Sequence, residues 1–369
     1  MSNSRIPASD SSLPSLPAQP AAVSWPTSSW SSGPQIAGNP DRLCDLLDQA
    51  FDPASADSLG ETLACLVVQG GLIVEERYAA EVTAQTPLIS WSVGKSITQA
   101  AVGILVADGL LDPTMPVDAP EWQSAGDPRQ AITMNDLLEM RSGLQFVEDY
   151  VDDKESDCLE MLFGSGTHDV AGYAASRPLE HSVGSVFNYS SGTTNIIARH
   201  VAHVLGAGAD PAERRRVMLE FLQERLFGPL GMSTAEPRFD AAGTFIGSSY
   251  LFASAQDFAR FGLLYLRDGV WGSQRILPEG WVNAARTAVS VDPDDGWLYG
   301  QHWWVRRGSA TNSRGTGPGE IFWANGYEKQ IVMCIPNSDT VLVRLGKTTA
   351  DQRDSFESYW DQVIAACTD

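Results

Sequence analysis

SVGKSITQAAVGILVA, residues 92–107, is the stretch that decides the expected fold. Its apolar residues recur at helical spacing from Val93 to Leu105, which predicts a helix beginning at Ser92. Ser92 and Lys95 lie three residues apart and therefore share one face of the first turn. The amide of a residue at this position has no partner within the helix and lies at the positive end of the helix dipole. The stretch thus predicts a serine nucleophile with a base beside it.

The base is a lysine in a chain that rarely uses lysine. Only four of the 25 basic residues are lysines: Lys95, Lys154, Lys329 and Lys347. An arginine stays protonated at any usable pH, whereas a lysine withdrawn from water can lose its proton and accept one from serine. Lysine is therefore the residue that this chemistry requires at position 95. A Ser-x-x-Lys pair alone also arises by chance, so a second catalytic element is needed.

Tyr189 is the candidate for that second element. It lies in FNYSSG, residues 187–192, just before a segment with helical spacing over 193–205. A tyrosine near a lysine ammonium and a helix N-terminus would have its phenolate favoured, which predicts a lowered pKa and a role as base or acid. Ser191 either hydrogen-bonds Lys95 or caps the following helix.

The composition indicates a globular, enzyme-sized protein and argues against several classes of partner. The chain has 369 residues, 43% of them hydrophobic, and a formal net charge of −21. That charge disfavours nucleic acids and anionic membrane surfaces, which require basic patches. No run approaches the ~18 apolar residues of a membrane span, and the first residues lack the pattern of an export signal. We therefore expect a cytoplasmic protein without a membrane partner.

The cysteines and histidines give no indication of a metal site. The five cysteines are scattered, have no CxxC spacing and are expected to be reduced core residues. They are Cys44, Cys65, Cys158, Cys334 and Cys367. His200 and His203 are the only histidines close to each other, and no third ligand lies near them. We expect neither a metal nor a cofactor.

The pattern along the chain predicts an α+β fold, an α/β sandwich plus an all-α domain. Residues 1–40 are rich in Ser, Pro and Ala, which predicts an extended or disordered leader. Residues 41–130 and 290–369 carry the strand patterns and are expected to form one antiparallel sheet domain. Residues 131–289 are expected to form a helical domain covering the site. The expected strands are 63–68, 72–78, 300–305, 321–323, 330–335 and 340–345, and the expected helices after residue 107 are 133–140, 157–163, 193–205, 210–227, 255–266, 278–288 and 354–366.

Four motifs in one order resemble a known family. They are Ser92-x-x-Lys95, DLLEMRSGL at 136–144, Tyr189-x-Ser191 and PLGM at 229–232. Over roughly residues 60–367 the chain resembles the serine hydrolases related to class C β-lactamases and penicillin-binding proteins, above all the branch of 6-aminohexanoate-dimer hydrolases and carboxylesterases. The resemblance implies an antiparallel sheet flanked by helices, with a helical insert and the site in the cleft between them. It also implies that Ser92 attacks a carbonyl, Lys95 accepts its proton and Tyr189 relays a proton to the leaving group.

The family's third element is Lys-Thr-Gly or a variant, and its nearest match here is Ala-Asn-Gly at 324–326. The resemblance implies that Asn325 and Gly326 border the substrate. It also implies that the backbone N–H of Tyr327 pairs with that of Ser92 as the oxyanion hole, which stabilises the negative charge formed during attack.

The third element departs from the family pattern. Penicillin-recognising members use its Lys and Thr to hold a substrate carboxylate, and neither Ala324 nor Asn325 supplies a charge. Aligning residues 321–323 there instead also leaves the lysine missing. β-Lactam turnover is therefore not the expected main activity.

Tyr150 and His302 are further candidates for substrate contacts. Tyr150 lies in the acidic stretch EDYVDD, residues 148–153, where the amide-hydrolysing branch carries a tyrosine and acidic residues that touch the substrate. A solvated loop explains the acidic residues equally well, and a packed strand position explains His302. Trp303 and Trp304 alternate across the same expected strand, so one is expected in the core while the other walls the cleft.

The expected function is hydrolysis of a small ester or linear amide through an acyl-enzyme on Ser92. Two alternatives stay open: a penicillin-binding DD-peptidase or β-lactamase, and a non-catalytic ligand-binding relative on the same scaffold. An α/β-hydrolase is disfavoured because no Gly-x-Ser-x-Gly follows a strand. The expected partner is the small-molecule substrate, and the sequence does not decide between a monomer and a homodimer.

Overall fold

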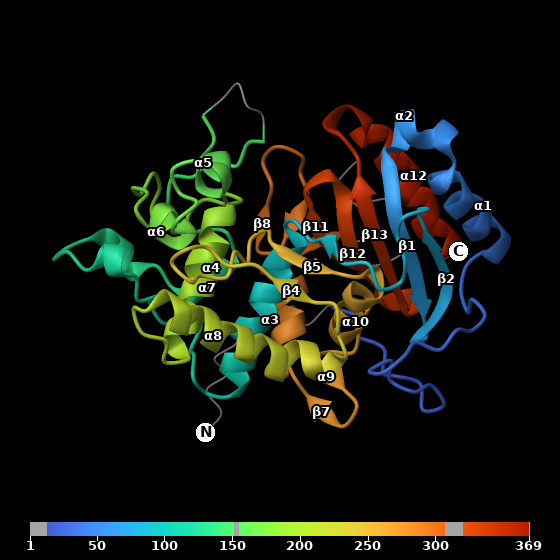
Figure 1. Cartoon of the computed structure of the whole chain (residues 1–369), viewed down its shortest axis with the longest axis horizontal. Helices are drawn as coiled ribbons and strands as arrows, with labels where there is room; N and C mark the ends of the chain where they lie inside the picture. Colours follow the sequence, from blue (N-terminus) through green and yellow to red (C-terminus); the bar gives the residue numbers. More distant parts are fainter. Residues whose placement is uncertain (1–12, 151–154, 307–319, 369) are drawn as a thin grey trace.

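The computed structural model describes residues 13–150, 155–306 and 320–368, which form a helical part beside a sheet (Figure 1). The sheet has eight strands in the order β2-β1-β13-β12-β11-β10-β9-β8, antiparallel at every pairing. Strands from both ends of the chain therefore build one sheet, as the sequence predicts. The strands are β1 (Glu61–Gln69), β2 (Leu72–Tyr78), β8 (Ser290–Val291), β9 (Leu298–Tyr299), β10 (Trp304–Arg306), β11 (Ile321–Gly326), β12 (Gln330–Ile335) and β13 (Thr340–Lys347).

Side chains alternate between the two faces of this sheet, and each face has its own helices. On β11, Trp323 belongs to the core cluster under one pair of helices, whereas its neighbour Phe322 belongs to the larger cluster on the other face. Because alternate side chains of a strand point to opposite faces, the sheet has apolar side chains on both faces. A layer of helices covers each face. The helices are α1 (Pro40–Phe51) and α12 (Arg353–Ala366) on the first face, and α3 (Val93–Ala107) and α10 (Ala255–Leu266) on the second.

The helical part surrounds α7 and lies to the left of the sheet in Figure 1. Its helices are α4 (Met134–Leu138), α5 (Asp157–Phe163), α6 (Val170–Ala175), α7 (Ser191–Val204), α8 (Pro211–Leu222) and α9 (Gly228–Leu230), with a π-helical turn over Gln223–Phe227. A small sheet of β3 (Leu88–Ile89), β5 (Leu251–Ala253) and β4 (Glu236–Pro237) lies between this part and the large sheet. Two short helices, α2 (Ala56–Leu59) and α11 (Trp281–Arg286), and the hairpin of β6 (Val270–Trp271) and β7 (Gln274–Arg275) complete the description. Across the three described ranges, no helix has the length and apolar character that crossing a membrane requires.

The helical domain expected over 131–289 is not continuous, because α10 within it packs on the sheet. A Cβ at Gly262 would lie 2.6 Å from a methyl group of Val341 and 3.0 Å from one of Val332. The thiol of Cys334 on β12 also donates a hydrogen bond to the carbonyl of Gly262. α10 therefore belongs to the sheet half of the molecule.

The leader runs along the body over its described part, from residue 13 onward. The indole Nε1 of Trp30 donates to the carbonyl of Gln256, at 3.3 Å. Two arginines, both at least 95% buried, donate to leader carbonyls: Arg260 to Pro26 at 2.8 Å and Arg286 to Pro14 at 2.6 Å. The sequence predicts a leader that is either extended or disordered. From residue 13 onward the leader is extended, and residues 1–12 lie outside the described part of the structure.

Candidate active site

The turn between β3 and α3 presents Ser92. Trp91 adopts a left-handed backbone conformation with a φ of 42°, which ends β3 and turns the chain into the helix. Ser90 fixes this turn to β5, because its N–H donates to the Leu251 carbonyl and its hydroxyl accepts from the Leu251 N–H. Ser92 follows as the N-cap residue of α3. Its hydroxyl is therefore held at the start of the helix, as the sequence predicts.

Lys95 lies one turn along α3, with its amine between two serine hydroxyls. The Nζ atom is 2.8 Å from the Oγ of Ser92 and 2.8 Å from the Oγ of Ser191, and it also contacts the Ser248 carbonyl at 3.3 Å. Burial lowers the pKa of Lys95 below its ordinary value, and the negative charge of Glu148 opposes that shift. The buried amine is thus suited to accept a proton from Ser92.

Ser191 is free to hold Lys95 because another residue caps α7. Ser190 is the N-cap residue, and its Oγ accepts a hydrogen bond from the N–H of Thr193 at 3.1 Å. Of the two roles expected for Ser191, the structure supports the contact with the lysine.

Tyr189 lies over the same amine. The Nζ of Lys95 is 4.8 Å from the centroid of the Tyr189 ring, and the ring stacks on Trp304 at 5.5 Å. Burial raises the pKa of the phenol, the charge of Glu148 adds to the rise, and a side-chain hydrogen bond with Ser92 lowers it. The predicted direction of the pKa shift was wrong, because desolvation and the charge of Glu148 outweigh the hydrogen bond with Ser92. A protonated phenol at neutral pH favours proton donation over acting as the initial base.

Glu148 is a site residue that the sequence did not single out. Its Oε1 accepts hydrogen bonds from the hydroxyls of Ser191, at 2.5 Å, and Tyr150, at 2.8 Å, while its Oε2 accepts the Ser191 N–H at 2.7 Å. Asp157, at the start of α5, holds the loop by accepting the N–H of Val147 at 2.8 Å. The carboxylate of Glu148 thus completes a hydrogen-bonded chain from Lys95 through Ser191 to Tyr150. In the sequence, nothing distinguishes Glu148 from the acidic residues beside it.

The end of β11 lies against the nucleophile turn. A Cβ at Gly326 would lie 2.5 Å from the carbonyl oxygen of Ser90, so only glycine allows this approach. The next residue, Tyr327, has its ring 5.8 Å from that of Trp91 and 4.8 Å from that of Tyr150. This places the Tyr327 backbone beside the start of α3. Donation by its N–H to an oxyanion stays a prediction.

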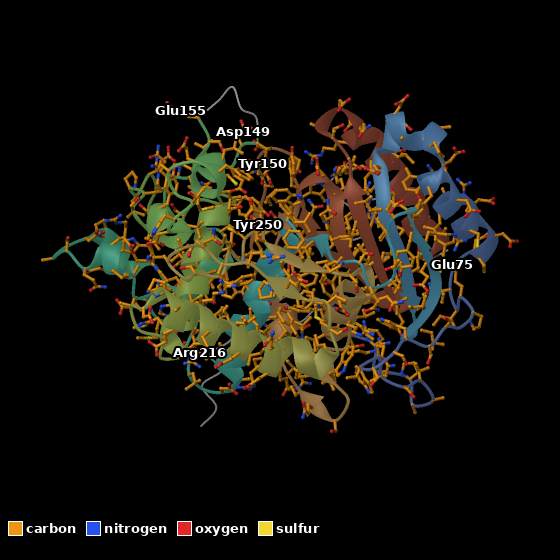
Figure 2. All side chains as sticks on the ribbon, in the orientation of Figure 1. Glu75, Asp149, Tyr150, Glu155, Arg216 and Tyr250 are labelled. Carbon is orange, nitrogen blue, oxygen red and sulfur yellow. The ribbon has the colours of Figure 1, made fainter. Side chains whose placement is uncertain are left out.

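A cleft of about 650 Å³ lies over Ser92. Tyr150 lies between the helical part and the sheet, with Asp149 near it and Tyr250 below it in the view of Figure 2. Trp303 is fully buried in the core, whereas Trp304 walls the cleft. The predicted site residues that line the cleft are Ser92, Tyr150, Tyr189, Asn325, Gly326 and Tyr327. A smaller and mainly apolar hollow of about 160 Å³ extends from Ser92 and Ser191 toward Cys158, Leu159 and Leu162.

His302 is not a substrate contact, contrary to one of the two roles considered. It is 98% buried and interrupts the expected strand 300–305 with a φ of 59°. Its Nδ1 donates to the Leu138 carbonyl at 2.9 Å, which leaves Nε2 to accept from the Thr194 hydroxyl at 3.0 Å. Burial lowers its pKa to about 3. The ring is therefore a neutral link between α4, α7 and the sheet.

Carboxylates dominate the charge of the cleft. Its acidic residues are Glu148, Asp149, Asp292, Asp294, Asp295 and Glu328. Among the described residues, the two cations that line it are both paired: Lys329 with Glu357 at 2.7 Å, and Arg353 with Asp295 at 2.8 Å. Within the described ranges no group of three or more His, Cys, Asp or Glu residues is arranged to hold a metal ion. The cleft thus favours neutral or cationic substrates.

Comparisons with known proteins agree with this geometry. A family model described as Beta-lactamase matches residues 47–366. The 6-aminohexanoate-dimer hydrolase of Paenarthrobacter ureafaciens is 26% identical over 322 residues, which cover 82% of this chain and 75% of that protein. A putative 6-aminohexanoate-dimer hydrolase from Bacillus anthracis has a similar structure, with a TM-score of 0.71, 20% identity and coverage of 92% of this chain and 88% of that one. A penicillin binding protein from Bacillus halodurans shares the fold at a TM-score of 0.61 and 16% identity, covering 83% of this chain and 98% of that one.

Proposed function

Because the chain belongs to the beta-lactamase family and is a serine hydrolase, we propose that it cleaves linear amides or small esters through an acyl-enzyme on Ser92. The observation that carries the mechanism is the buried Lys95 amine, 2.8 Å from the Oγ of Ser92. Burial lowers the pKa of Lys95 and so increases the fraction of the neutral amine, which is the form that takes the serine proton.

The proposed reaction uses three side chains and two backbone amides. Lys95 takes the hydroxyl proton as Ser92 bonds to the substrate carbonyl carbon, and the N–H groups of Ser92 and Tyr327 stabilise the resulting oxyanion. Tyr189 then donates its proton to the leaving nitrogen or oxygen as that bond breaks, and the proton held by Lys95 restores the phenol. Water then attacks the carbonyl carbon of the acyl-enzyme. In this half of the reaction Tyr189 takes the proton of the water and a proton returns to the oxygen of Ser92, which releases the carboxylic acid.

The charge of the cleft supports a neutral or cationic substrate in place of a carboxylate-bearing β-lactam. Ala324 is 99% buried in the core and Asn325 carries no charge, so the third element offers no cation. The carboxylates around the cleft would repel an anion. The 6-aminohexanoate dimer, which the name of the Paenarthrobacter relative gives for that protein, carries an ammonium group that such a cleft favours and a carboxylate that must lie away from these acidic side chains.

Substrate hydrolysis by matched variants tests this proposal. Wild-type protein should hydrolyse p-nitrophenyl acetate or the linear dimer of 6-aminohexanoate faster than it hydrolyses nitrocefin. Ser92→Ala and Lys95→Arg should each lower kcat/KM by about 10³-fold or more, since the first loses the nucleophile and the second keeps charge without accepting a proton. Lys347→Arg, at an exposed position, is the matched control. Full activity in either site variant would refute the mechanism, and faster turnover of nitrocefin would refute the substrate class.

We also propose a cytoplasmic location, supported by the five cysteines, all of which are free thiols. Fractionation of the producing cells tests it, and recovery of the protein outside the cytoplasm would contradict it.

A further inference from the structure

A second cavity lies on the α12 face of the sheet, next to the active-site cleft. Its volume is about 320 Å³, and it is walled by β10, β11, β12 and α12. Five aromatic side chains surround it: Trp297, Trp304, Trp323, Phe356 and Trp360. Trp297 and Trp323 meet edge to face at 5.2 Å, while Phe356 and Trp360 stack at 5.7 Å. Such walls favour a flat apolar group.

The cavity adjoins the cleft over Ser92. The residues that line both hollows are Asp295, Trp304, Asn325, Lys329 and Arg353. Trp304 stacks on Tyr189, the proposed proton donor, at 5.5 Å and an interplanar angle of 30°. Trp304 thus lies at the boundary between the two hollows and beside the proposed proton donor to the leaving group.

The polar groups of the cavity indicate a neutral occupant. Each cation that the structure describes in its lining is in an ion pair: Arg306 with Asp361 at 2.7 Å, Lys329 with Glu357 at 2.7 Å, and Arg353 with Asp295 at 2.8 Å. An anion would have to break one of these pairs. Trp360 is 95% buried, and its indole Nε1–H has no hydrogen-bond partner among the described residues. Because this nitrogen has almost no accessible surface, it does not face the cavity, and the aromatic walls are what the cavity offers to a ligand.

We propose that this cavity is a distal leaving-group subsite, which binds a neutral aryl group. The proposal rests on the proposed function, since it concerns the substrates of the same Ser92. It specifies that the preferred esters and amides have an aromatic group several bonds beyond the scissile bond.

The KM values of a series of acetate esters test whether the subsite binds an aryl group. Acetates of ω-phenylalkanols of increasing chain length are compared with the n-alkyl acetates of matched length, because the leaving alcohols then have the same basicity. At the length that reaches the cavity, the phenyl ester should have a KM about tenfold below that of its alkyl partner.

Three variants separate the subsite from a general effect on the enzyme. Ser358→Trp puts a large side chain at an exposed α12 position that lines the cavity, and the KM ratio of alkyl to phenyl ester should return to about one. Ser355→Trp, exposed on the same helix and outside the lining, should keep the wild-type ratio. Trp360→Phe, which keeps an aromatic wall beside Phe356, should keep a KM ratio of alkyl to phenyl ester above one.

The outcomes distinguish the two proposals. If methyl acetate, all longer acetates and the linear dimer of 6-aminohexanoate resist wild-type protein, the proposed function fails. If the short esters react and no phenyl ester of any length shows a lowered KM, the subsite is refuted while the function stands. An equal loss of the ratio in Ser358→Trp and Ser355→Trp would also refute the subsite, because the effect would then not depend on the cavity.

Discussion

At the scale of single residues, Glu148 connects the loop before α5 to the catalytic lysine. Its carboxylate binds Ser191 through both oxygens, and Ser191 in turn contacts Lys95. The carboxylate therefore both fixes the position of the amine and favours its charged form. These two effects are separable, because glutamine keeps acceptor oxygen without the charge.

The first prediction concerns the pH dependence of catalysis. Burial lowers the pKa of Lys95 and the charge of Glu148 raises it, so Glu148→Gln should lower that pKa further. The acidic limb of the kcat/KM profile, where activity rises as Lys95 loses its proton, should move to lower pH. Profiles of ester hydrolysis measure this shift, with Glu155→Gln at an exposed position as control. An unchanged limb, or one moved upward, would show that Glu148 does not set the protonation of the lysine.

His302 supplies a second prediction, on stability in acid. Its pKa is about 3 in the folded protein and ordinarily 6.5, so the unfolded chain binds a proton over this interval and the folded chain does not. Stability is thus lost as pH falls from 6.5 toward 3, on the order of 3 kcal/mol by pH 4 from this residue.

Urea unfolding at pH 7 and pH 4.5 measures the contribution of this ring. His302→Gln should be less stable than wild type at pH 7, because it loses the links to Leu138 and Thr194, yet it should lose less stability between the two pH values. Equal losses in both proteins would contradict the assignment.

The sequence indicated Ser92, Lys95 and Tyr189 because local spacing carries their roles. A helix puts residues three apart on one face, and this alone brings the hydroxyl of Ser92 to Lys95. Glu148 and His302 have roles that arise only from the tertiary fold. The partners of His302, for example, come from α4 and α7, and no pattern in the local sequence indicates that these helices lie next to it.

At the scale of elements, periodicity predicted the segments better than their packing. β2, β12, α5 and α10 have the bounds that the sequence indicates. The sequence of α10 shows an apolar stripe but does not show which element packs against it. The sequence therefore predicts that this helix belongs to the helical domain over 131–289. The close approach of Gly262 to β12 and β13 is visible only in three dimensions.

The third prediction tests that approach. On an exposed helix, Gly→Ala stabilises by about 0.5–1 kcal/mol. At position 262, however, the added methyl would meet Val341 at 2.6 Å, so Gly262→Ala should destabilise the protein by about 1–3 kcal/mol. A double-mutant cycle with Val341→Ala, followed by urea unfolding, should show a favourable coupling of about 1 kcal/mol. If the two mutations change the free energy of unfolding additively, the added methyl group does not press on Val341.

At the scale of the whole molecule, the leader is a structural strap across the sheet half. It supplies acceptors to three buried arginines: Arg260 binds the Pro26 carbonyl, Arg267 binds the Gln19 side chain, and Arg286 binds the Pro14 carbonyl. A Ser/Pro/Ala-rich composition predicts an extended segment without showing where it lies. The buried arginines that receive it are more than 200 residues away in sequence.

The fourth prediction is that removal of residues 1–30 lowers the Tm by several degrees. The truncation leaves buried guanidinium groups without these acceptors, and each lost partner costs about 1–3 kcal/mol. Differential scanning fluorimetry measures the change. Labelling of Ser92 by a fluorophosphonate at low temperature checks that the shortened protein still folds. An unaltered Tm would show that the strap contributes nothing to stability.

The pairing of β1 with β13 has a consequence for synthesis of the protein. Glu61 lies opposite Lys347, so the first long strand of the sheet meets a partner that is translated only after the whole helical part. On the ribosome, β1 and β2 emerge with an open edge, which stays unpaired until β13 has been translated. Premature termination before β13 therefore produces an aggregation-prone polypeptide, and quality control must remove it whole.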